Sequence, residues 1–341
     1  MIAGVRIMSN KKDYITVMNV ISCMAVVLIH TNGGFWTYSH SRNWVMSSVI
    51  ECVMYFAVPI FFMISGTTLI DYNQRYSLKE YIIKRIEKVV IPFIFWSAAA
   101  FIYYGKYNEG GIRSIIEGFI NCNFMGIYWF IPILIALYIA IPFISLIPID
   151  KRERVFRYCI IVGFIFNCLI PQIADLAKLN IYMFPQFAIT KDALIYVFIG
   201  YYISNYPIEK NKRYFIYALG VLGLALRYFG MVSLSLKQGY IEQMFNGYYK
   251  FACVTYSTAV YLFLKNIRYN KKVIQLCEFI AKQTFGIYMV HYFIMDIIIN
   301  KFSINVFSFK WKLGGAVLVF IISWGIVRIL QKIPVLRKIV P

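Results

Sequence analysis

Charged residues are scarce in this sequence. Only 15% of its 341 residues are charged, whereas a soluble domain normally carries about 25%. Hydrophobic residues make up 60% of the chain and aromatic residues 18%. This composition excludes an ordinary soluble domain and indicates a protein whose main solvent is the lipid bilayer.

Acidic residues are especially few, with 15 against 35 lysines and arginines, and the formal net charge is +20. A nucleic-acid-binding protein would gather its basic residues on one water-exposed face, together with aromatic stacking platforms. Here the basic residues fall in short breaks between apolar runs, as membrane topology demands. We therefore expect no nucleic-acid partner.

Motifs for metals, disulfides and signal cleavage are also missing. No small-residue cleavage site follows the first apolar run, which begins near Tyr14 after a basic start, so this run is predicted to be a retained helix. The cysteines show no CxxC spacing and are interpreted as small buried hydrophobic residues, with neither a metal site nor a disulfide framework. They are Cys23, Cys52, Cys122, Cys159, Cys168, Cys253 and Cys277.

Long apolar runs dominate the rest of the chain. A helix needs about 20 apolar residues to cross a hydrocarbon core of roughly 30 Å. Such windows occur near 14–32, 46–70, 89–104, 126–147, 156–171, 189–205, 214–231, 248–264, 276–299 and 312–330. They leave no room for a separate soluble domain. The sequence therefore predicts one all-α domain over 1–341, a polytopic membrane bundle of about ten transmembrane helices.

The distribution of positive charge sets the orientation. With a cytoplasmic N-terminus, 23 of the 35 lysines and arginines fall in cytoplasmic segments and nine in outer ones. The positive-inside rule then predicts cytoplasmic termini and a multi-pass protein of the cytoplasmic membrane. Two amphipathic segments, 77–88 and 112–124, are predicted to lie in the membrane interface, in contact with lipid headgroups.

Ionisable residues inside the spans are functional candidates, because each costs at least about 2.5 kcal/mol at a helix centre. His30 lies about 24 Å along its helix from Tyr14, near the outer end, and Glu51 lies at a similar depth in the next span. A carboxylate beside an imidazole suits a general base that deprotonates a sugar hydroxyl. Alternatively, both residues are merely interfacial. The full set is His30, Glu51, Asp192, Arg227, Glu278, Lys282, His291 and Asp296.

Two further groups have plain structural alternatives. Arg85 and Lys88 bring cations to the cytoplasmic start of the third span, where they serve either as topology anchors or as a site for a phosphate-rich ligand. Ser65 and Gly66 end the second span, where glycine permits the close approach of a ligand or, equally, of a packed helix. A lone histidine among apolar neighbours, such as His291, is more often structural than functional.

Six short segments also carry a family resemblance. Together they resemble the acyltransferase 3 family, whose members O-acylate peptidoglycan, capsule, lipopolysaccharide and other extracytoplasmic glycans. Each segment is weak alone, but the six follow the family order over nearly the whole chain. They are Ala25–His30, Pro59–Gly66, Lys84–Lys88 with Pro92, Tyr128–Pro132 with Tyr138 and Pro142, Tyr196–Tyr202, and Gly286–His291.

The sequence departs from the family pattern at two positions. An arginine usually precedes the first-span histidine by eleven residues, and Asn19 stands there in this chain. The family's Arg-x-x-Arg motif is matched by Arg85 and Lys88, which keeps both charges but loses one planar fork for bidentate phosphate contact. The resemblance therefore leaves the donor site in place but with a changed set of contacts.

The resemblance implies an O-acyltransferase with no permanently bound cofactor. Its donor would be cytoplasmic acyl-CoA, commonly acetyl-CoA, and its acceptor a hydroxyl of an outer surface glycan or lipid-linked sugar. The implied catalytic pair is His30 and Glu51. The implied donor site contains Arg85, Lys88, Ser65 and Gly66. The implied acceptor site contains Tyr128, Trp129, Asn19 and His291.

Two other classes of protein remain as alternatives. A transporter or flippase of lipid-linked sugars would have a similar number of spans, but the chain shows no pair of Gly/Pro-interrupted spans at matching positions in two halves. A receptor or membrane-bound racemase can carry a similar helical module fused to other domains, and no such partner domain is expected before Pro341.

Overall fold

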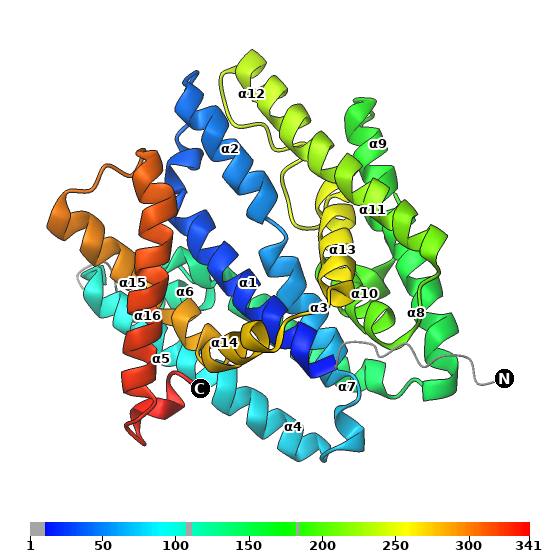
Figure 1. Cartoon of the computed structure of the whole chain (residues 1–341), viewed down its shortest axis with the longest axis horizontal. Coiled ribbons are helices and arrows are strands. Elements are labelled where there is room, and N and C mark those ends of the chain that lie inside the picture. Colours follow the sequence, from blue (N-terminus) through cyan, green and yellow to red (C-terminus); the bar gives the residue numbers. More distant parts are fainter. Residues whose placement is uncertain (1–10, 107–110, 182–183) are drawn as a thin grey trace. The chain divides into compact units, whose positions relative to one another are not determined.

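The structure is a computed structural model that describes residues 11–106, 111–181 and 184–341, and every regular element in these ranges is helical. The predicted all-α class is therefore confirmed, and the helices are drawn in Figure 1. The chain groups into two compact units that alternate along the sequence. Unit 1 contains residues 1–68, 148–281 and 305–316, and unit 2 contains residues 69–147, 282–304 and 317–341.

Unit 1 contains the first helices of the chain and a long central block. Its α-helices are α1 (Lys11–Thr31), α2 (Arg42–Met54), α3 (Ala57–Leu69), α8 (Ile149–Gly163), α9 (Ile170–Leu176), α10 (Leu194–Asn205), α11 (Lys210–Ala225), α12 (Met231–Gln238), α13 (Phe251–Asn266) and α14 (Lys271–Ala281). Three π-helical segments also belong to it, η6 (Phe164–Leu169), η8 (Leu226–Gly230) and η9 (Trp311–Gly315).

Unit 2 contains α4 (Leu78–Arg85), α5 (Ile91–Tyr103), α6 (Ile112–Ile120), α7 (Phe130–Ser145), α15 (Thr284–Phe302) and α16 (Ala316–Leu330). The π-helical segment η3 (Ile86–Val90) joins α4 to α5 without a break. The predicted interfacial segment 77–88 is thus continuous with the helix that follows it, whereas 112–124 contains the separate short helix α6.

Eight helices among the described residues are long and apolar enough to cross a membrane. They are Asp13–Thr31, Arg42–Gln74, Leu78–Tyr103, Gly126–Ser145, Ile149–Leu176, Lys210–Gln238, Thr284–Phe302 and Trp311–Leu330. The windows predicted at 189–205 and 248–264 form α10 and α13, of only 12 and 16 residues. A 12-residue helix rises about 18 Å, and most side chains of α10 are buried, so its apolar character serves packing inside the protein.

Prolines interrupt the long helices at defined places. Pro59 has no N–H to donate to the carbonyl of Tyr55, and the helix breaks between α2 and α3 at that point. The break leaves the Val53 carbonyl available to accept a hydrogen bond of 2.9 Å from the Tyr256 hydroxyl. Pro92 likewise cannot bond the carbonyl of Lys88, and the wider π turn of η3 occupies this position.

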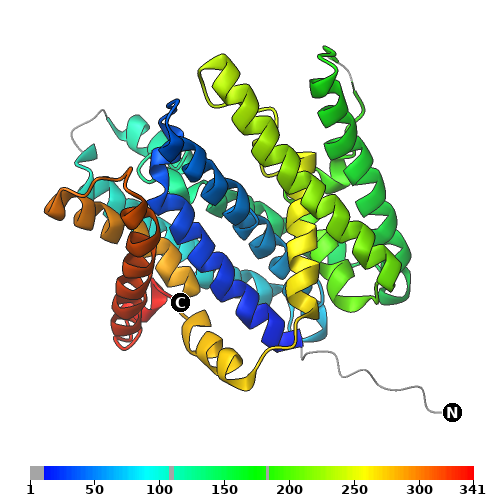
Figure 2. The same cartoon turned by 45° about the horizontal axis from the view of Figure 1, so that its top comes forward.

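Glycines allow the closest helix crossings in unit 1. A Cβ atom on Gly66 of α3 would lie 2.1 Å from the Val197 carbonyl oxygen of α10, and one on Gly200 would lie 2.1 Å from the Met63 carbonyl oxygen of α3. The two glycines therefore let the two backbones touch. A second crossing joins α11 to α13, which lie side by side in both views (Figures 1 and 2).

Large apolar side chains remain exposed on the long helices. Ile102 on α5, Phe143 on α7 and Phe229 on η8 are exposed by 67%, 72% and 68%. Exposed apolar surface of this extent would be a liability in water but suits contact with lipid tails. The long apolar helices and their exposed apolar faces together define a multi-pass membrane protein.

Candidate active site

His30 occupies the last turn of α1 and is half-buried. Asn19 lies eleven residues earlier on the same helix and is also half-buried. Eleven residues amount to three turns plus about 20°, so the two side chains share one face, about 16 Å apart along the axis. The helix geometry thus places Asn19, which occupies the position of the family's arginine, on the same face of α1 as His30.

Three hydrogen bonds, called the polar lock below, fix the end of α1 that carries His30. The Thr31 hydroxyl donates to the Lys312 carbonyl of η9 at 3.0 Å, and the Asn32 amide donates to the Ser47 carbonyl of α2 at 2.9 Å. The Lys312 ammonium group in turn donates to the Ser47 hydroxyl. Asn32 is fully buried and Lys312 nearly so. The lock therefore ties three segments together directly beside His30.

Glu51 lies one helical turn after Ser47 on α2 and is only 1% exposed. Its carboxylate interacts with the side-chain amide of Asn32 and with the charge of Arg227. Asn32 follows His30 by two residues, so the structure brings the end of α1 to the stretch of α2 that carries Glu51. The direct pairing of His30 with Glu51 stays a prediction.

Arg227 is a fully buried cation of unit 1 and lies in the π-helical segment η8. Its guanidinium carbon lies 3.3 Å from the centroid of the Tyr55 ring, and its Nη2 donates to the Asn246 side-chain oxygen at 2.7 Å. The other face of Tyr55 stacks on Tyr248, with ring centroids 4.1 Å apart and planes 3° from parallel. A cation over a desolvated aromatic ring is stabilised by about 2 kcal/mol or more.

Several atoms of this cluster have no hydrogen-bond partner among the described residues. They are Oε2 of Glu51, Oδ1 of Asn32, and Nε and Nη1 of Arg227. A buried polar group left unpaired costs about 1–3 kcal/mol, and more when it is charged. The cluster therefore offers both acceptors and donors, the combination that a hydroxyl-bearing ligand can satisfy. We refer to Glu51, Asn32, Arg227 and Asn246 as the polar cluster.

The structure gives Ser65 and Gly66 a packing role in α3. The Ser65 hydroxyl donates to the Phe61 carbonyl one turn earlier at 3.0 Å. The space beside Gly66 is filled by the backbone of Val197. Both observations account for this small-residue pair by helix packing, and the predicted contact with the donor stays a prediction.

The predicted phosphate-binding pair lies in unit 2, where α4 meets η3. Arg85 is half-buried between two rings, with its guanidinium carbon 5.6 Å from the Tyr81 centroid and 5.3 Å from the Tyr138 centroid. Its Nε is buried without a partner among the described residues. Lys88 is exposed. By contrast, Lys84 is paired with Glu80 at 2.6 Å, so Arg85 and Lys88 are the better placed of the three cations for a ligand.

The predicted acceptor residues of unit 2 meet at the short turn η5 (Gly126–Trp129). The Tyr128 hydroxyl donates to the Met289 carbonyl at 2.7 Å, and the Tyr288 hydroxyl donates to the Ile127 carbonyl. These reciprocal bonds fasten the turn to α15. Tyr128 is fully buried, whereas Trp129 is half-buried. Trp129 is therefore the member of the pair with surface available to a ligand.

His291 is fully buried in α15. Its Nδ1 lies 2.8 Å from the Tyr288 carbonyl oxygen and 3.1 Å from that of Ile287. Carbonyl oxygens only accept hydrogen bonds, so Nδ1 carries the proton of the neutral ring. This arrangement holds the imidazole against its own helix.

Sequence reasoning missed part of the site. Lys312 is one of the nine cations that the predicted topology places outside, yet it is buried beside Ser47. Asn32 and Asn246 carried no signal, because a neutral amide near a predicted span end is indistinguishable from a solvated loop residue. Arg227 was visible as an ion inside an apolar run, but its partners come from segments distant in sequence. No group of three or more metal-ligating side chains occurs among the residues described.

These features define a class, a multi-pass helical membrane protein with a buried polar cluster at one helix end. The acyltransferase domain of the acyltransferase 3 family matches residues 12–328, nearly the whole chain, and the protein belongs to this family. The resemblance seen in the six sequence segments is thereby confirmed. No curated protein matches the chain. No solved structure matches it either. The chain is accordingly an acyl-transferring enzyme.

Proposed function

We propose that this enzyme transfers an acyl group, in the first instance acetyl, from cytoplasmic acyl-CoA to a hydroxyl of an extracytoplasmic glycan. The observation that carries the proposal is the polar cluster beside the end of α1. It contains Asn32, two residues after His30, together with a buried carboxylate and a buried guanidinium, and some of its amide and carboxylate oxygens have no partner among the described residues. A family member that acylates hydroxyls needs such groups around its general base.

In the proposed reaction, His30 accepts the proton of the acceptor hydroxyl as its oxygen attacks the thioester carbonyl. The new C–O bond forms, the C–S bond of the thioester breaks, and the proton leaves with the CoA thiolate. General-base assistance of this kind contributes about 10²–10⁴-fold to a rate. Glu51 lies near the positive charge of Arg227 and interacts with the side chain of Asn32. Asn32 also donates to the Ser47 carbonyl, so it fixes the turn that follows His30.

The donor contacts are proposed for Arg85 and Lys88. The positive-inside distribution assigns this stretch to the cytoplasmic side, where acyl-CoA is present. The ring stacking of Arg85 on Tyr81 and Tyr138 fixes its guanidinium plane before a ligand arrives. A fixed guanidinium with a free N–H loses little entropy on binding a phosphate. Lys88 would add a second, mobile charge.

The acceptor contact is proposed for Trp129, with Tyr128 and His291 as positioning residues. Asn19 lies about 16 Å before His30 on α1, so its acceptor role stays a prediction. Tyr128 bonds the backbone of α15, and His291 bonds its own helix, so both are already engaged. Trp129 keeps exposed surface, and an aromatic ring with a polar N–H suits a sugar face.

A thiol-release assay tests the proposed function. Purified protein receives acetyl-CoA with candidate surface glycans, and free CoA thiol is measured over time. The proposal predicts thiol release that requires both substrates and matches the acetyl ester formed on the glycan. A transporter or flippase of lipid-linked sugars would release no thiol, and that result across a broad glycan panel would overturn the proposal.

A further inference from the structure

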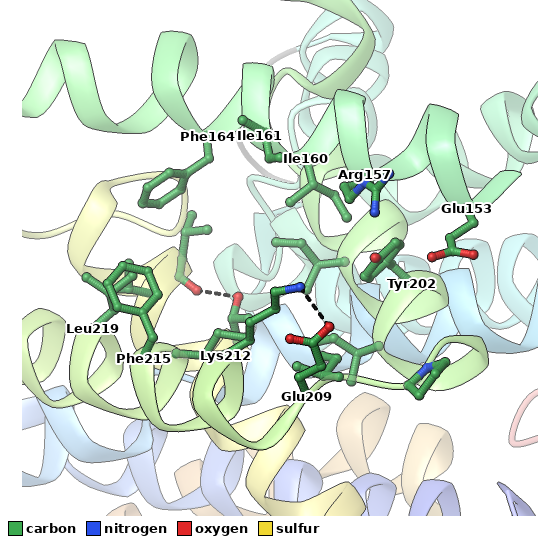
Figure 3. Close-up of a pocket in the computed structure, with 18 residues that line it drawn as sticks. Glu153, Arg157, Ile160, Ile161, Phe164, Tyr202, Glu209, Lys212, Phe215 and Leu219 are labelled. Carbon is green, nitrogen blue, oxygen red and sulfur yellow. Dashed lines mark hydrogen bonds and ion pairs between the residues drawn. The ribbon is translucent and has the colours of Figure 1, made fainter.

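A cavity of about 680 Å³ lies within unit 1, among α8, α10, α11 and α13, and contains none of the candidate active-site residues. Its volume falls in the range of about 300–1,000 Å³ typical of ligand sites. Residues of α8 line one wall and residues of α11 the opposite wall (Figure 3). The floor is formed by α10 and α13, through the buried side chains of Ile199, Ile203, Val254 and Thr255.

Helix packing explains why the space is left open. The α8 helix packs on α10 through Phe156 and Phe198, whose rings meet edge to face at 4.9 Å. Two glycines let α11 pack closely on α13. A Cβ on Gly220 would lie 2.3 Å from the Ala259 side chain, and one on Gly223 would lie 2.2 Å from the Thr255 hydroxyl. Each outer helix thus follows its own partner, and the cavity lies between the two pairs.

The two ends of the cavity differ sharply in character. Glu153, Arg157, Glu209 and Lys212 gather at one end, and Glu209 pairs with Lys212 at 3.2 Å (Figure 3). The other end is walled by apolar side chains, among them Phe164 of η6. The cavity is therefore amphipathic, with a charge-balanced mouth and an apolar interior.

The depth of the cavity matches one membrane leaflet. From Glu153 to Phe164 is eleven residues of continuous helix, or about 16 Å at 1.5 Å per residue. This is close to half of a hydrocarbon core of about 30 Å. The charged mouth lies in segments that the positive-inside distribution places at the cytoplasmic surface. An acyl chain of the cytoplasmic leaflet therefore fits the cavity lengthwise.

The interior excludes a sugar. Its two threonine hydroxyls are already used, since Thr255 donates to the Phe251 carbonyl at 2.9 Å and Thr258 to the Val254 carbonyl at 2.7 Å. A glycan placed there would leave its hydroxyls unpaired.

The mouth also disfavours CoA. Two carboxylates, Glu153 and Glu209, stand beside the two cations, and they would repel a ligand that carries several phosphates. A phosphate and an ammonium on one headgroup would instead find a partner for each charge.

We infer that this cavity binds a zwitterionic glycerophospholipid of the phosphatidylethanolamine type, with one acyl chain inserted along α8 and α11. Its phosphate contacts Arg157 and Lys212, and its ammonium contacts Glu153 and Glu209. This lipid site is separate from the proposed acyl transfer and does not depend on it. The lipid seals the open side of unit 1 toward the cytoplasmic leaflet.

Native mass spectrometry of the full-length protein tests this inference with three probes of identical acyl chains, phosphatidylethanolamine, phosphatidylcholine and phosphatidylglycerol. We expect phosphatidylethanolamine to bind at least about tenfold more tightly than the other two, because neither of them can donate an ammonium hydrogen bond to Glu153 or Glu209. Equal or tighter binding of phosphatidylglycerol, or displacement of bound phosphatidylethanolamine by CoA, would overturn the inference.

Two variants separate the mouth from the interior. Glu153→Lys with Glu209→Lys changes only exposed positions and should reverse the preference toward phosphatidylglycerol by about tenfold. Ile216→Trp fills the interior and should release the retained lipid. The matched control is Val221→Trp, on the same helix, 70% exposed and outside the cavity lining. An unchanged headgroup preference in the charge variant, or equal lipid retention in the two tryptophan variants, would contradict the assignment.

Discussion

The two units hold their candidate residues in opposite ways. In unit 1, Glu51 and Arg227 are buried and leave polar atoms without partners among the described residues. In unit 2, Lys88 is exposed, and Tyr128 and His291 are bonded to backbone carbonyls, whereas the half-buried Arg85 keeps one Nε without a partner among the described residues. Satisfied or solvated groups cost little, whereas buried unpaired ions are expensive. We therefore propose that the chemistry depends mainly on unit 1 and that most candidate residues of unit 2 supply positioning and surface contacts.

The largest effect should come from His30→Ala. Loss of the general base is expected to lower acyl transfer by roughly 10²–10⁴-fold while leaving expression and membrane insertion intact. The matched control is His40→Ala, because His40 is exposed and its side chain bonds to nearby Tyr38 at 3.1 Å. The measurement is thiol release at saturating substrates. Transfer by His30→Ala above about a tenth of the wild-type rate would remove His30 from the mechanism.

Arg227→Met tests how much the buried polar cluster of unit 1 contributes to stability. It removes the cation that contacts the Tyr55 ring and donates to Asn246. Loss of a desolvated cation–π contact and of a charge-assisted hydrogen bond should lower the free energy of unfolding by about 2–5 kcal/mol. Thermal unfolding in detergent measures it.

Glu51→Gln, alone and combined with Arg227→Met, completes a double-mutant cycle on the polar cluster. If the two side chains interact, the combined variant should lose less unfolding free energy than the sum of the two single variants. Strict additivity would show that the two side chains are independent and would weaken the cluster as a unit.

Gly66→Ala distinguishes packing from ligand contact. The added Cβ would meet the Val197 carbonyl oxygen, so we expect a loss of at least about 1–3 kcal/mol in unfolding free energy. Gly314→Ala is the control, because in the described part of the chain no atom beyond its own helix backbone and its two neighbours lies within 4 Å of its Cβ position. A raised KM for the donor with unchanged unfolding in Gly66→Ala would instead support a ligand contact at this glycine.

The smallest effect is expected at the two candidate donor cations of unit 2, the half-buried Arg85 and the exposed Lys88. Arg85→Gln and Lys88→Gln should each raise the KM for the acyl-CoA donor about tenfold, because each removes one charge-assisted contact. The KM for the acceptor should hardly change. Lys84→Gln serves as the control for topology, since Lys84 is engaged with Glu80 in the same stretch. A normal donor KM in the double variant, with unchanged topology, would leave the two cations as membrane anchors.

The sequence predicted the helical class and the family, because both depend on long apolar runs and on short ordered segments. It also marked His30, Glu51 and Arg227, since an ion inside an apolar run is conspicuous. It could not assign Asn32, Asn246 or Lys312, whose roles arise from contacts between segments far apart in sequence. The windows 189–205 and 248–264 are predicted as membrane spans, but α10 and α13 are not among the helices long and apolar enough to cross, because a buried helix and a spanning helix share the same hydropathy.

We propose that the acyl group moves from a cytoplasmic donor to an outer acceptor. Inside-out vesicles containing the protein test it directly, with radiolabelled acetyl-CoA supplied outside, at the cytoplasmic face, and the glycan acceptor trapped inside. The account predicts labelled ester on the enclosed glycan, an equal amount of free CoA outside, and loss of both in His30→Ala. Label that reaches the glycan only when donor and acceptor share one side of the membrane would contradict it.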